Sequence, residues 1–319
     1  QEALRRMPMR TRVEIRRELA EAGELQALIG DSIRSERKEE VAVIQFRCPL
    51  TIAQASSYLD QFFSTSVRYL GPLRDEPKSL YPLAPTADPS DVGIKGEHTA
   101  AVLDLHKSTQ VRYLPTLAFA EAEIKGRPTT RSLEAAVTDW LHYLGVAEGV
   151  QTRDRGKFGH ELTVSVDGDS GSHDLTHVGV GVSQVLPILV ASLLADLDTT
   201  LIFEQPELHL HPKVQTLLAD FFLSMTALGK QCIVETHSEY LINRVRFRTA
   251  AAVEGNPWLA RQKMYFVERP SEGSTFREVE INEFGAVVEW PEGFFDQSQK
   301  EAEDILRVAS KKRKLLRGN

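Results

Sequence analysis

The side chains best suited to chemistry lie in residues 199–212, where acidic residues and histidines directly follow an apolar run. The run at 201–203 predicts a buried parallel strand, and Glu204 stands at its end. Pro206 has no N–H to give to a sheet, so the strand ends before it. Parallel strands bring polar groups to the carboxyl edge of a sheet, where α/β proteins bind their ligands. Glu204 and Glu207 are therefore candidates for metal binding and for proton transfer.

A helix is predicted after this acidic corner, and a further strand after the helix. Pro212 suits the first turn of a helix, and the apolar residues behind it recur at helical spacing, at positions 214, 217, 218, 221, 222 and 225. Residues 231–235 then predict another buried strand, which leads to His237. The order is therefore strand, acidic corner, helix, strand and histidine.

A second corner, with two glycines, precedes these elements. Gly179 and Gly181 allow the backbone to approach a ligand closely, and Ser183 is a good N-cap residue. Gln184 and the apolar run at 185–194 follow, and they predict a buried helix. Exposed N–H groups and the positive end of a helix dipole together favour an anion. This corner is therefore predicted to bind an anion.

The order of these motifs resembles the C-terminal half of an ABC-type ATPase head, as in the structural-maintenance-of-chromosomes and overcoming-lysogenization-defect groups. Residues 179–184 resemble the signature loop, 201–207 the Walker B motif and 208–211 the D-loop, and His237 resembles the switch histidine. Three further stretches are similar to one prokaryotic branch of AAA-type ATPases: 69–74, 92–97 and 290–297. The last of them is similar to the small C-terminal domain of uncharacterised function in that branch.

The resemblance implies an α/β fold with a mostly parallel sheet flanked by helices, an antiparallel portion and a small C-terminal appendage. It also implies ATP and Mg²⁺ as cofactors, with Glu204 binding Mg²⁺ through a water molecule. Gly179, Gly181, Ser183 and Gln184 would bind the γ-phosphate of a nucleotide held by another subunit. Two heads would then close as a dimer around composite sites, with ATP holding them together.

The sequence departs from the family at the Walker B motif. Glu204 takes the place of the usual aspartate, and Gln205 takes the place of the usual glutamate that polarises water. A neutral amide can orient water but cannot accept its proton. Three interpretations stay open: Glu207 serves as the base, hydrolysis is slow, or Gln205 only positions the water. We favour Glu207. His237 would donate to the γ-phosphate; the alternative is a histidine bonded inside the core.

The phosphate loop of such an ATPase does not occur in the chain, since no Gly-x-x-x-x-Gly-Lys-[Ser/Thr] is found. Without it the α- and β-phosphates have no cradle, so we expect this chain alone to bind ATP poorly. A Walker A lobe would come from the same, longer protein or from a partner chain, and the start at Gln1 rather than at a methionine favours the longer protein. Arg74 is a candidate for contact with the phosphates or a plain structural arginine.

The composition is typical of a soluble globular chain, with 42% hydrophobic residues and a formal net charge of -7. The acidic balance argues against indiscriminate nucleic-acid binding, although DNA contact through a local basic face, such as 311–314, stays open. No apolar run reaches the roughly 18 residues of a membrane span, and the first residues lack the apolar core typical of a signal peptide. Cys48 and Cys232 lie in apolar contexts, so we expect a cytoplasmic protein without disulfides.

The chain is predicted to divide into four parts. They are a charged helical arm at 1–40, an insertion and helical part of the head at 41–175, the signature, Walker B and switch-histidine lobe at 176–262, and a small C-terminal domain with a basic tail at 263–319. We also expect strands at 41–46, 67–70, 161–166 and 263–268, helices at 53–63, 100–105 and 132–144, and a hairpin at 276–290.

Three functional hypotheses follow. The first is an ATP-binding and ATP-hydrolysing head that dimerises and regulates an effector protein such as a nuclease, in prokaryotic defence against phage; this biological role is implied by the resemblance alone. The alternative is a non-hydrolysing, ATP-gated scaffold that binds DNA or a partner protein. The third, a metal-dependent hydrolase, would use as transition-metal ligands Glu204, Glu207, His209, His211 and His237.

Overall fold

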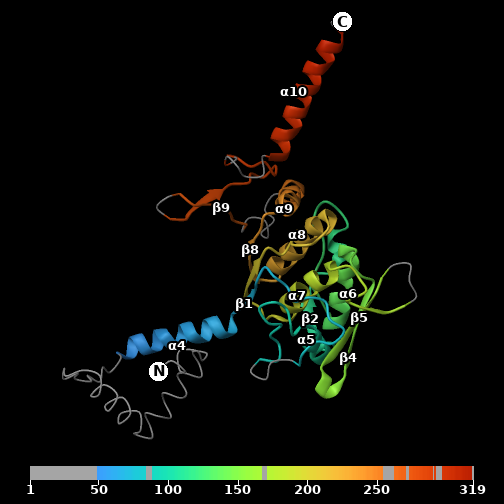
Figure 1. The fold of residues 1–319 in the computed structure, drawn as a ribbon. Coiled ribbons are helices and arrows are strands. Elements are labelled where there is room, and N and C mark those ends of the chain that lie inside the picture. Colours follow the sequence, from blue (N-terminus) through green and yellow to red (C-terminus); the bar gives the residue numbers. More distant parts are fainter. Residues whose placement is uncertain are drawn as a thin grey trace, which may run out of the picture. The chain divides into compact units, whose positions relative to one another are not determined.

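The computed structural model describes residues 49–83, 88–166, 171–253, 262–270, 273–289, 291 and 297–317. The chain forms two compact units, Gln1–Tyr58 and Leu59–Asn319. Helix α4 (Leu50–Thr65) begins in the first unit and buries none of its residues. The predicted arm at 1–40 and the strand at 41–46 lie outside the described residues. The second unit contains the described elements that follow α4 (Figure 1).

A three-stranded parallel sheet carries the predicted acidic corner. Its strands are, in spatial order, β1 (Val67–Leu70), β7 (Thr200–Glu204) and β8 (Gln231–Glu235). Strand β7 is parallel to both neighbours, and Glu204 lies opposite Glu235 in the register. Because the three strands run in one direction, their carboxyl ends meet at a single edge. The predicted parallel sheet is therefore confirmed.

One face of this sheet is buried and the other is partly open to solvent. Leu201 and Phe203 of β7 are 0% and 1% exposed, whereas Tyr69 and Ile233 on the opposite face are 41% and 48% exposed. The register places Ile202 between Tyr69 and Ile233, so these three side chains form a row across the sheet. Parallel sheets are normally covered on both faces, so an exposed apolar row here is unusual.

Helices pack the core beside this sheet. They are α6 (Leu133–Leu144), α7 (Gly181–Leu194) and α8 (Pro212–Ala227). Helix α7 is buried along most of its length, as its almost entirely apolar sequence requires. Gly145 ends α6 with φ 68°, the left-handed conformation that glycine adopts most easily at the end of a helix. The helices predicted at 132–144 and after Pro212 are therefore confirmed.

The remaining described elements of the second unit are short helices and antiparallel strands. The strands pair as β2 with β3, β4 with β5, β5 with β6, and β9 with β10. Their bounds are β2 (Gln110–Tyr113), β3 (Thr129–Ser132), β4 (Gly149–Asp154), β5 (His160–Ser165), β6 (His173–Asp174), β9 (Met264–Glu268) and β10 (Thr275–Val279). The helices are α5 (Thr99–His106), η1 (Thr116–Phe119), η2 (Gly156–Phe158), α9 (Glu239–Ala251) and α10 (Gln297–Arg317). An α/β fold with an antiparallel portion is thus confirmed.

The hairpin predicted at 276–290 is wrong in its partner strand. Strand β10 pairs with the preceding β9, while Ile281 and Val287 form only a single bridge around a tight turn. Gly285 in this turn has φ 74°, and a Cβ added there would lie 2.4 Å from the backbone oxygen of Arg246 on α9. The Nε of Arg246 also donates to the carbonyl of Gly285 at 2.9 Å. This turn therefore packs directly on α9.

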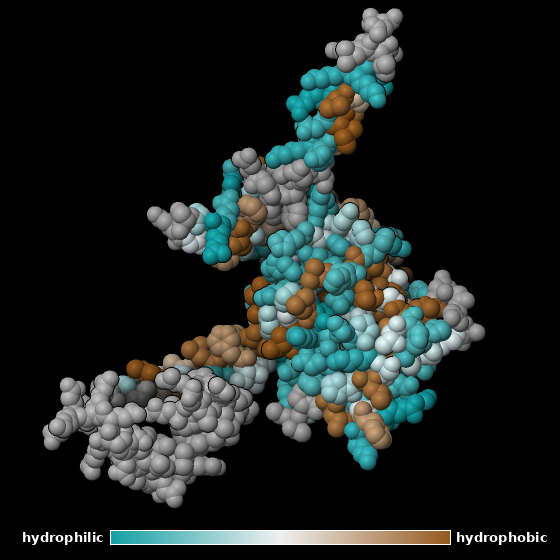
Figure 2. Space-filling view, in the orientation of Figure 1, coloured by the Kyte–Doolittle hydropathy of each residue, from teal (hydrophilic) through white to brown (hydrophobic). Residues whose placement is uncertain are grey.

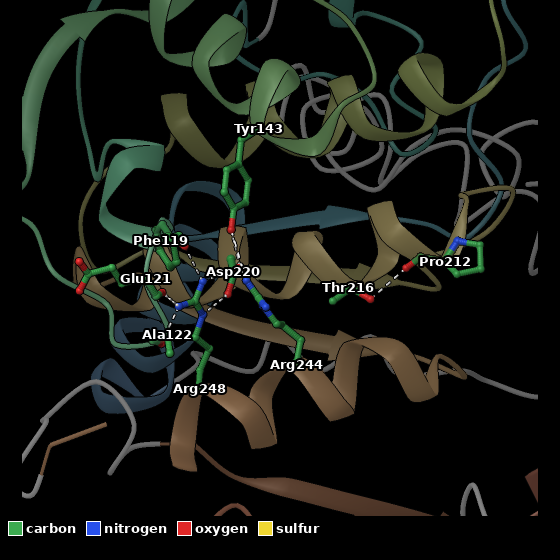
Figure 3. Close-up of polar contacts among 9 residues, drawn as sticks. All are labelled: Phe119, Glu121, Ala122, Tyr143, Pro212, Thr216, Asp220, Arg244 and Arg248. Atoms are coloured by element: carbon green, nitrogen blue, oxygen red, sulfur yellow. Dashed lines mark hydrogen bonds and ion pairs between the residues drawn. The ribbon is translucent and has the colours of Figure 1, made fainter. Parts of the chain in front are cut away.

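A buried ion-pair network joins α8 and α9 to α6 and to the segment around residues 119–122 (Figure 3). Asp220 of α8 is 0% exposed and accepts hydrogen bonds from Tyr143 at 2.7 Å, Arg244 at 2.6 Å and Arg248 at 2.8 Å. Arg248, 1% exposed, also donates to the backbone carbonyls of Phe119, Glu121 and Ala122. Because every member is bonded, the network fixes α9 against α6 and α8.

Helix α10 is polar with a short apolar stripe. Ile305, Leu306 and Val308 are 65%, 70% and 63% exposed, and Figure 2 shows brown residues on the otherwise polar surface of this helix. The predicted basic tail continues this helix, and residues 311–313 are exposed. Among the described helices, none combines the length and the apolar character that crossing a membrane requires.

Candidate functional site

The acidic corner follows β7 in a strained turn. Glu204 ends the strand half-buried, and Gln205 has φ 42°, a left-handed backbone that side chains other than glycine rarely adopt. The N–H of Gln205 donates to the carbonyl of Glu235 at 2.9 Å, which holds the turn against the end of β8. The turn therefore presents Glu204 and Gln205 at the carboxyl edge of the sheet, as the sequence predicts.

Glu207 connects this corner to the segment that follows β8. Its side chain is 7% exposed, and its Oε1 accepts the backbone N–H of His237 at 2.6 Å. Its other oxygen, Oε2, is buried and has no hydrogen-bond partner among the described residues. A buried carboxylate oxygen without a partner is costly and needs an explanation, which a bound water or ligand would provide. Glu207 is therefore both a structural acceptor and a group with a free acceptor oxygen.

The imidazole of His237 points away from the core. Its side chain is 76% exposed, and its Nε2 lies 3.3 Å from Oε1 of Glu235. Ser238 then caps α9, accepting from the N–H of Leu241 at 3.3 Å and donating to Gln215 of α8 at 2.6 Å. The alternative of a histidine bonded inside the core is wrong, because the ring is exposed at the same edge as Glu207.

Two more residues of this edge come from β1 and the loop after it. Tyr69 lies near Glu204, and burial together with this carboxylate raises the pKa of the phenol. Arg74 is 8% exposed, and none of its three guanidinium nitrogens has an acceptor in the described part of the chain. Burial lowers the pKa of Arg74 to about 10, against the attraction of Tyr69 and Glu207. The sequence offered a weak signal for Arg74, its position just after a strand and Gly71-Pro72, and for Tyr69 only its place in the stretch 69–74.

The glycine-bearing corner differs from the prediction in its cap. Helix α7 begins at Gly181 with Val180 as its N-cap, so Ser183 lies inside the first turn. The hydroxyl of Ser183 donates to the carbonyl of Val180 at 2.7 Å, and Ser183 and Gln184 are 7% and 8% exposed. The expectation of Ser183 as N-cap is therefore wrong, because the chain enters the helix three residues earlier. Gly179 is exposed, with no atom within 4 Å of an added Cβ.

This corner is distinct from the acidic one. No hydrogen bond or ion pair between described residues joins Ser183 or Gln184 to Glu204, Glu207 or His237. The two corners approach each other through apolar packing. A Cβ added at Gly181 would lie 4.0 Å from the side chain of Leu210, in the segment that resembles the D-loop.

The histidines of this region do not gather around a metal position. His209 is exposed, with φ 60°, while His211 caps α8 by accepting the N–H of Lys213 on its Nδ1 at 3.2 Å. No three His, Cys, Asp or Glu side chains among the described residues are grouped as metal ligands. The transition-metal alternative finds no support here. A hydrated Mg²⁺ needs fewer protein ligands, and the half-buried carboxylate of Glu204 at the sheet edge suits one.

Two parts of the chain match known protein families. Residues 85–243 match the family model described as an AAA domain, putative AbiEii toxin, Type IV TA system. Residues 261–305 match the family described as a protein of unknown function, DUF3696, which confirms the C-terminal domain expected from 290–297. The chain thus contains a segment that matches an AAA ATPase domain, followed by a DUF3696 segment. No protein with a curated function matches the chain at a significant level.

Solved structures of SMC heads align with the chain at low identity. One, described under ATP-driven dimerization and DNA-stimulated activation of SMC ATPases, is 12% identical, with a TM-score of 0.37, over 54% of this chain and 90% of that chain. An SMC head bound to the C-winged helix domain of ScpA is 11% identical, with a TM-score of 0.35, over 47% of this chain and 42% of that chain. The Pyrococcus furiosus Smc head with an extended coiled coil, bound to the C-terminal domain of ScpA, is 11% identical, with a TM-score of 0.34, over 54% and 37%.

Proposed function

We propose that this chain supplies the signature, Walker B and switch-histidine parts of a head that binds MgATP, hydrolyses it and closes as a dimer. One observation carries the proposal. Glu207 joins the turn after β7 to the backbone of His237 after β8, so that Glu204, Gln205, Glu207 and His237 share one edge of a parallel sheet. That edge is where α/β proteins bind nucleotides.

Each side chain has a role that fits its surroundings. Glu204 would hold a hydrated Mg²⁺, and the amide of Gln205 would orient the attacking water. Oε2 of Glu207, which lacks a partner among the described residues, accepts the proton of that water. The exposed imidazole of His237 donates to the terminal phosphate. MgATP brings the reactive phosphoryl group and the cation that neutralises its charge.

The glycine-bearing corner acts across a dimer interface in this proposal. Gly179 is exposed and free of neighbours, so its backbone is open to a phosphate held by a second copy. Gly181 and Ser183 would place the first turn of α7 against the same phosphate, with Gln184 in support. Within the described part of the chain this corner has no polar contact with Glu204, which agrees with a composite site.

Another segment, from the same protein or from a partner chain, would supply the phosphate loop. The chain contains no Walker A sequence, and the partly exposed row of Tyr69, Ile202 and Ile233 needs a cover. A lobe that packs on this row would bring its phosphate loop beside the carboxyl edge of β7. Both requirements are then met by one piece of structure.

Nucleotide-driven dimerisation tests the proposal. In the full-length protein that contains this chain, light scattering with MgATP should show dimers for wild type and monomers for Ser183→Arg and Glu204→Gln. Lys157→Ala, on the exposed η2 segment, is the matched control and should dimerise like wild type. Unchanged dimerisation in both test variants would overturn the proposal.

Phosphate release decides between the ATPase and the non-hydrolysing scaffold. The scaffold is favoured by a single feature, Gln205 in place of a carboxylate. Steady release well above background supports hydrolysis; MgATP-driven dimers without release support the scaffold. We further propose that the closed dimer acts on an effector protein, such as a nuclease, or on DNA, in prokaryotic defence against phage. Pull-down of one defined effector only in the presence of MgATP would support this role, and its independence of nucleotide would contradict it.

A further inference from the structure

Among the residues that the structure describes, two arginines are almost completely buried, and they differ in their contacts. Arg248, 1% exposed, uses all of its nitrogens: it bonds Asp220 and three backbone carbonyls. Arg74, 8% exposed, uses none of its nitrogens within the described part of the chain. A guanidinium stays charged and carries five N–H donors, so burial without acceptors is strongly unfavourable. Arg248 has the contacts of a structural arginine, and Arg74 lacks them.

The loop that carries Arg74 is itself well held. The N–H of Gly71 donates to the carbonyl of Ile94, and the N–H of Asp75 donates to the carbonyl of Lys95, both at 2.8 Å. Ile94 and Lys95 belong to a second loop, at residues 92–97. Gly96 of this loop lies against Pro187 of α7, so closely that a Cβ added at Gly96 would be 2.5 Å from the proline ring. Arg74 therefore lacks acceptors in a loop anchored on both sides, and poor local packing does not explain it.

The surroundings of Arg74 specify the ligand. Glu207 is near enough to stabilise the charged guanidinium, yet no hydrogen bond joins the two, and Oε2 of Glu207 lacks a partner as well. A group that fits both must accept from Arg74 and donate to Glu207. A phosphate with an ordered water does so, since phosphate oxygens accept the planar guanidinium in a bidentate manner and the water donates to the carboxylate.

We propose that Arg74 is a phosphate-binding residue of this edge, contacting the terminal phosphate of a nucleotide held by the same head. The inference rests on the proposed function. It adds to the nucleotide site a positively charged residue from the loop after β1, beside Glu204 and Glu207. It also assigns a specificity: a contact with the terminal phosphate favours ATP over ADP.

Binding of MgATP and MgADP to the full-length protein, measured by calorimetry for wild type, Arg74→Met and Arg74→Lys, tests this. Arg74→Met should weaken MgATP binding about tenfold or more and leave MgADP binding within about twofold of wild type. Arg74→Lys keeps the charge but lacks the planar guanidinium. Its MgATP affinity should therefore lie between those of wild type and Arg74→Met.

Thermal unfolding without nucleotide separates this role from a structural one. Arg74→Met removes an unpartnered buried charge, so its melting temperature should equal or exceed that of wild type, while the matched Arg248→Met should melt lower. Loss of stability in Arg74→Met equal to that in Arg248→Met would overturn the proposal. Wild-type MgATP affinity in Arg74→Met would overturn it while leaving the ATPase intact. Failure of wild type itself to bind MgATP would remove the proposed function and this inference together.

Discussion

The carboxylate of Glu207 accepts the backbone N–H of His237, 2.6 Å away and 30 residues later in the chain. This bond fixes the acidic turn after β7 to the start of the segment that becomes α9. Glu207 therefore holds the architecture of the edge in addition to the chemical role proposed for it. Substitutions can separate the two roles.

Glu207→Gln keeps an oxygen that accepts from His237 but removes the charge, whereas Glu207→Ala removes both. We expect Glu207→Gln to unfold close to wild type in urea and to lose turnover. Glu207→Ala should lose turnover and also about 1–3 kcal/mol of unfolding free energy, because a buried N–H is left unsatisfied. Undiminished turnover in a folded Glu207→Gln variant would return the role of base to another group.

Asp220 offers the strongest stability test. Replacing it with alanine leaves two arginines without their carboxylate, one of them fully buried. We expect a loss of about 3–5 kcal/mol in the free energy of unfolding, measured by urea denaturation monitored with circular dichroism. Thr216→Ala, one turn earlier on α8 and outside the network, is the control and should lie within about 0.5 kcal/mol of wild type. Equal stability of the two variants would show that the network does not hold α9.

The buried Lys230 should make the free energy of unfolding depend on pH. It is 3% exposed, its Nζ donates to the carbonyl of Ser192 at 2.6 Å, and burial lowers its pKa to about 8. In the unfolded chain a lysine keeps its proton up to about pH 10.4. Between these values the unfolded state binds more protons, so the contribution of Lys230 to unfolding free energy rises with pH, by at most about 1.4 kcal/mol per unit.

Cys232, beside Lys230, acts in the opposite direction, because burial raises the pKa of its thiol to about 12. The measurement is therefore the difference in unfolding free energy between wild type and Lys230→Met, taken from pH 7 to pH 10. We expect this difference to be flat up to about pH 8 and to move in favour of wild type above it. A difference that stays constant across the whole range would contradict the lowered pKa.

Alanine substitutions at Gly145 and Gly96 distinguish the cost of backbone strain from the cost of overfilling a packed contact. Gly145 and Gly96 have similar backbone angles, φ 68° and φ 77°, but only Gly96 faces an obstacle, Pro187, which an added Cβ would approach to 2.5 Å. Gly145→Ala should cost about 1–2 kcal/mol through the backbone alone. Gly96→Ala should cost about 1–3 kcal/mol more, because it overfills the contact with α7. Equal melting temperatures for the two variants would mean that the loop at 92–97 yields easily.

The predictable parts of this fold are those in which local pattern and tertiary environment agree. Strands β7 and β8 are short, apolar and bounded by polar residues, and α6 ends in a glycine, so sequence alone located them. The prediction of Ser183 as an N-cap was wrong, because its hydroxyl donates to the carbonyl of Val180 from inside the helix. Serine forms this bond as well as N-caps, and the sequence does not distinguish the two. The contacts of Glu207 with His237, and the burial of Arg74 at the same edge, join distant residues, and no local pattern encodes such contacts.

The backbone of the turn after β7 also affects how readily this segment opens to solvent. Gln205 and His209 hold left-handed backbone at φ 42° and φ 60° without being glycine, which costs each about 1–2 kcal/mol. Glycine would adopt these backbone angles without that strain. The segment is thus a local store of conformational energy, and its amides should exchange with solvent earlier than those of α7. A ligand that bonds these side chains would offset the strain, so slower exchange at 205–209 would report occupancy directly.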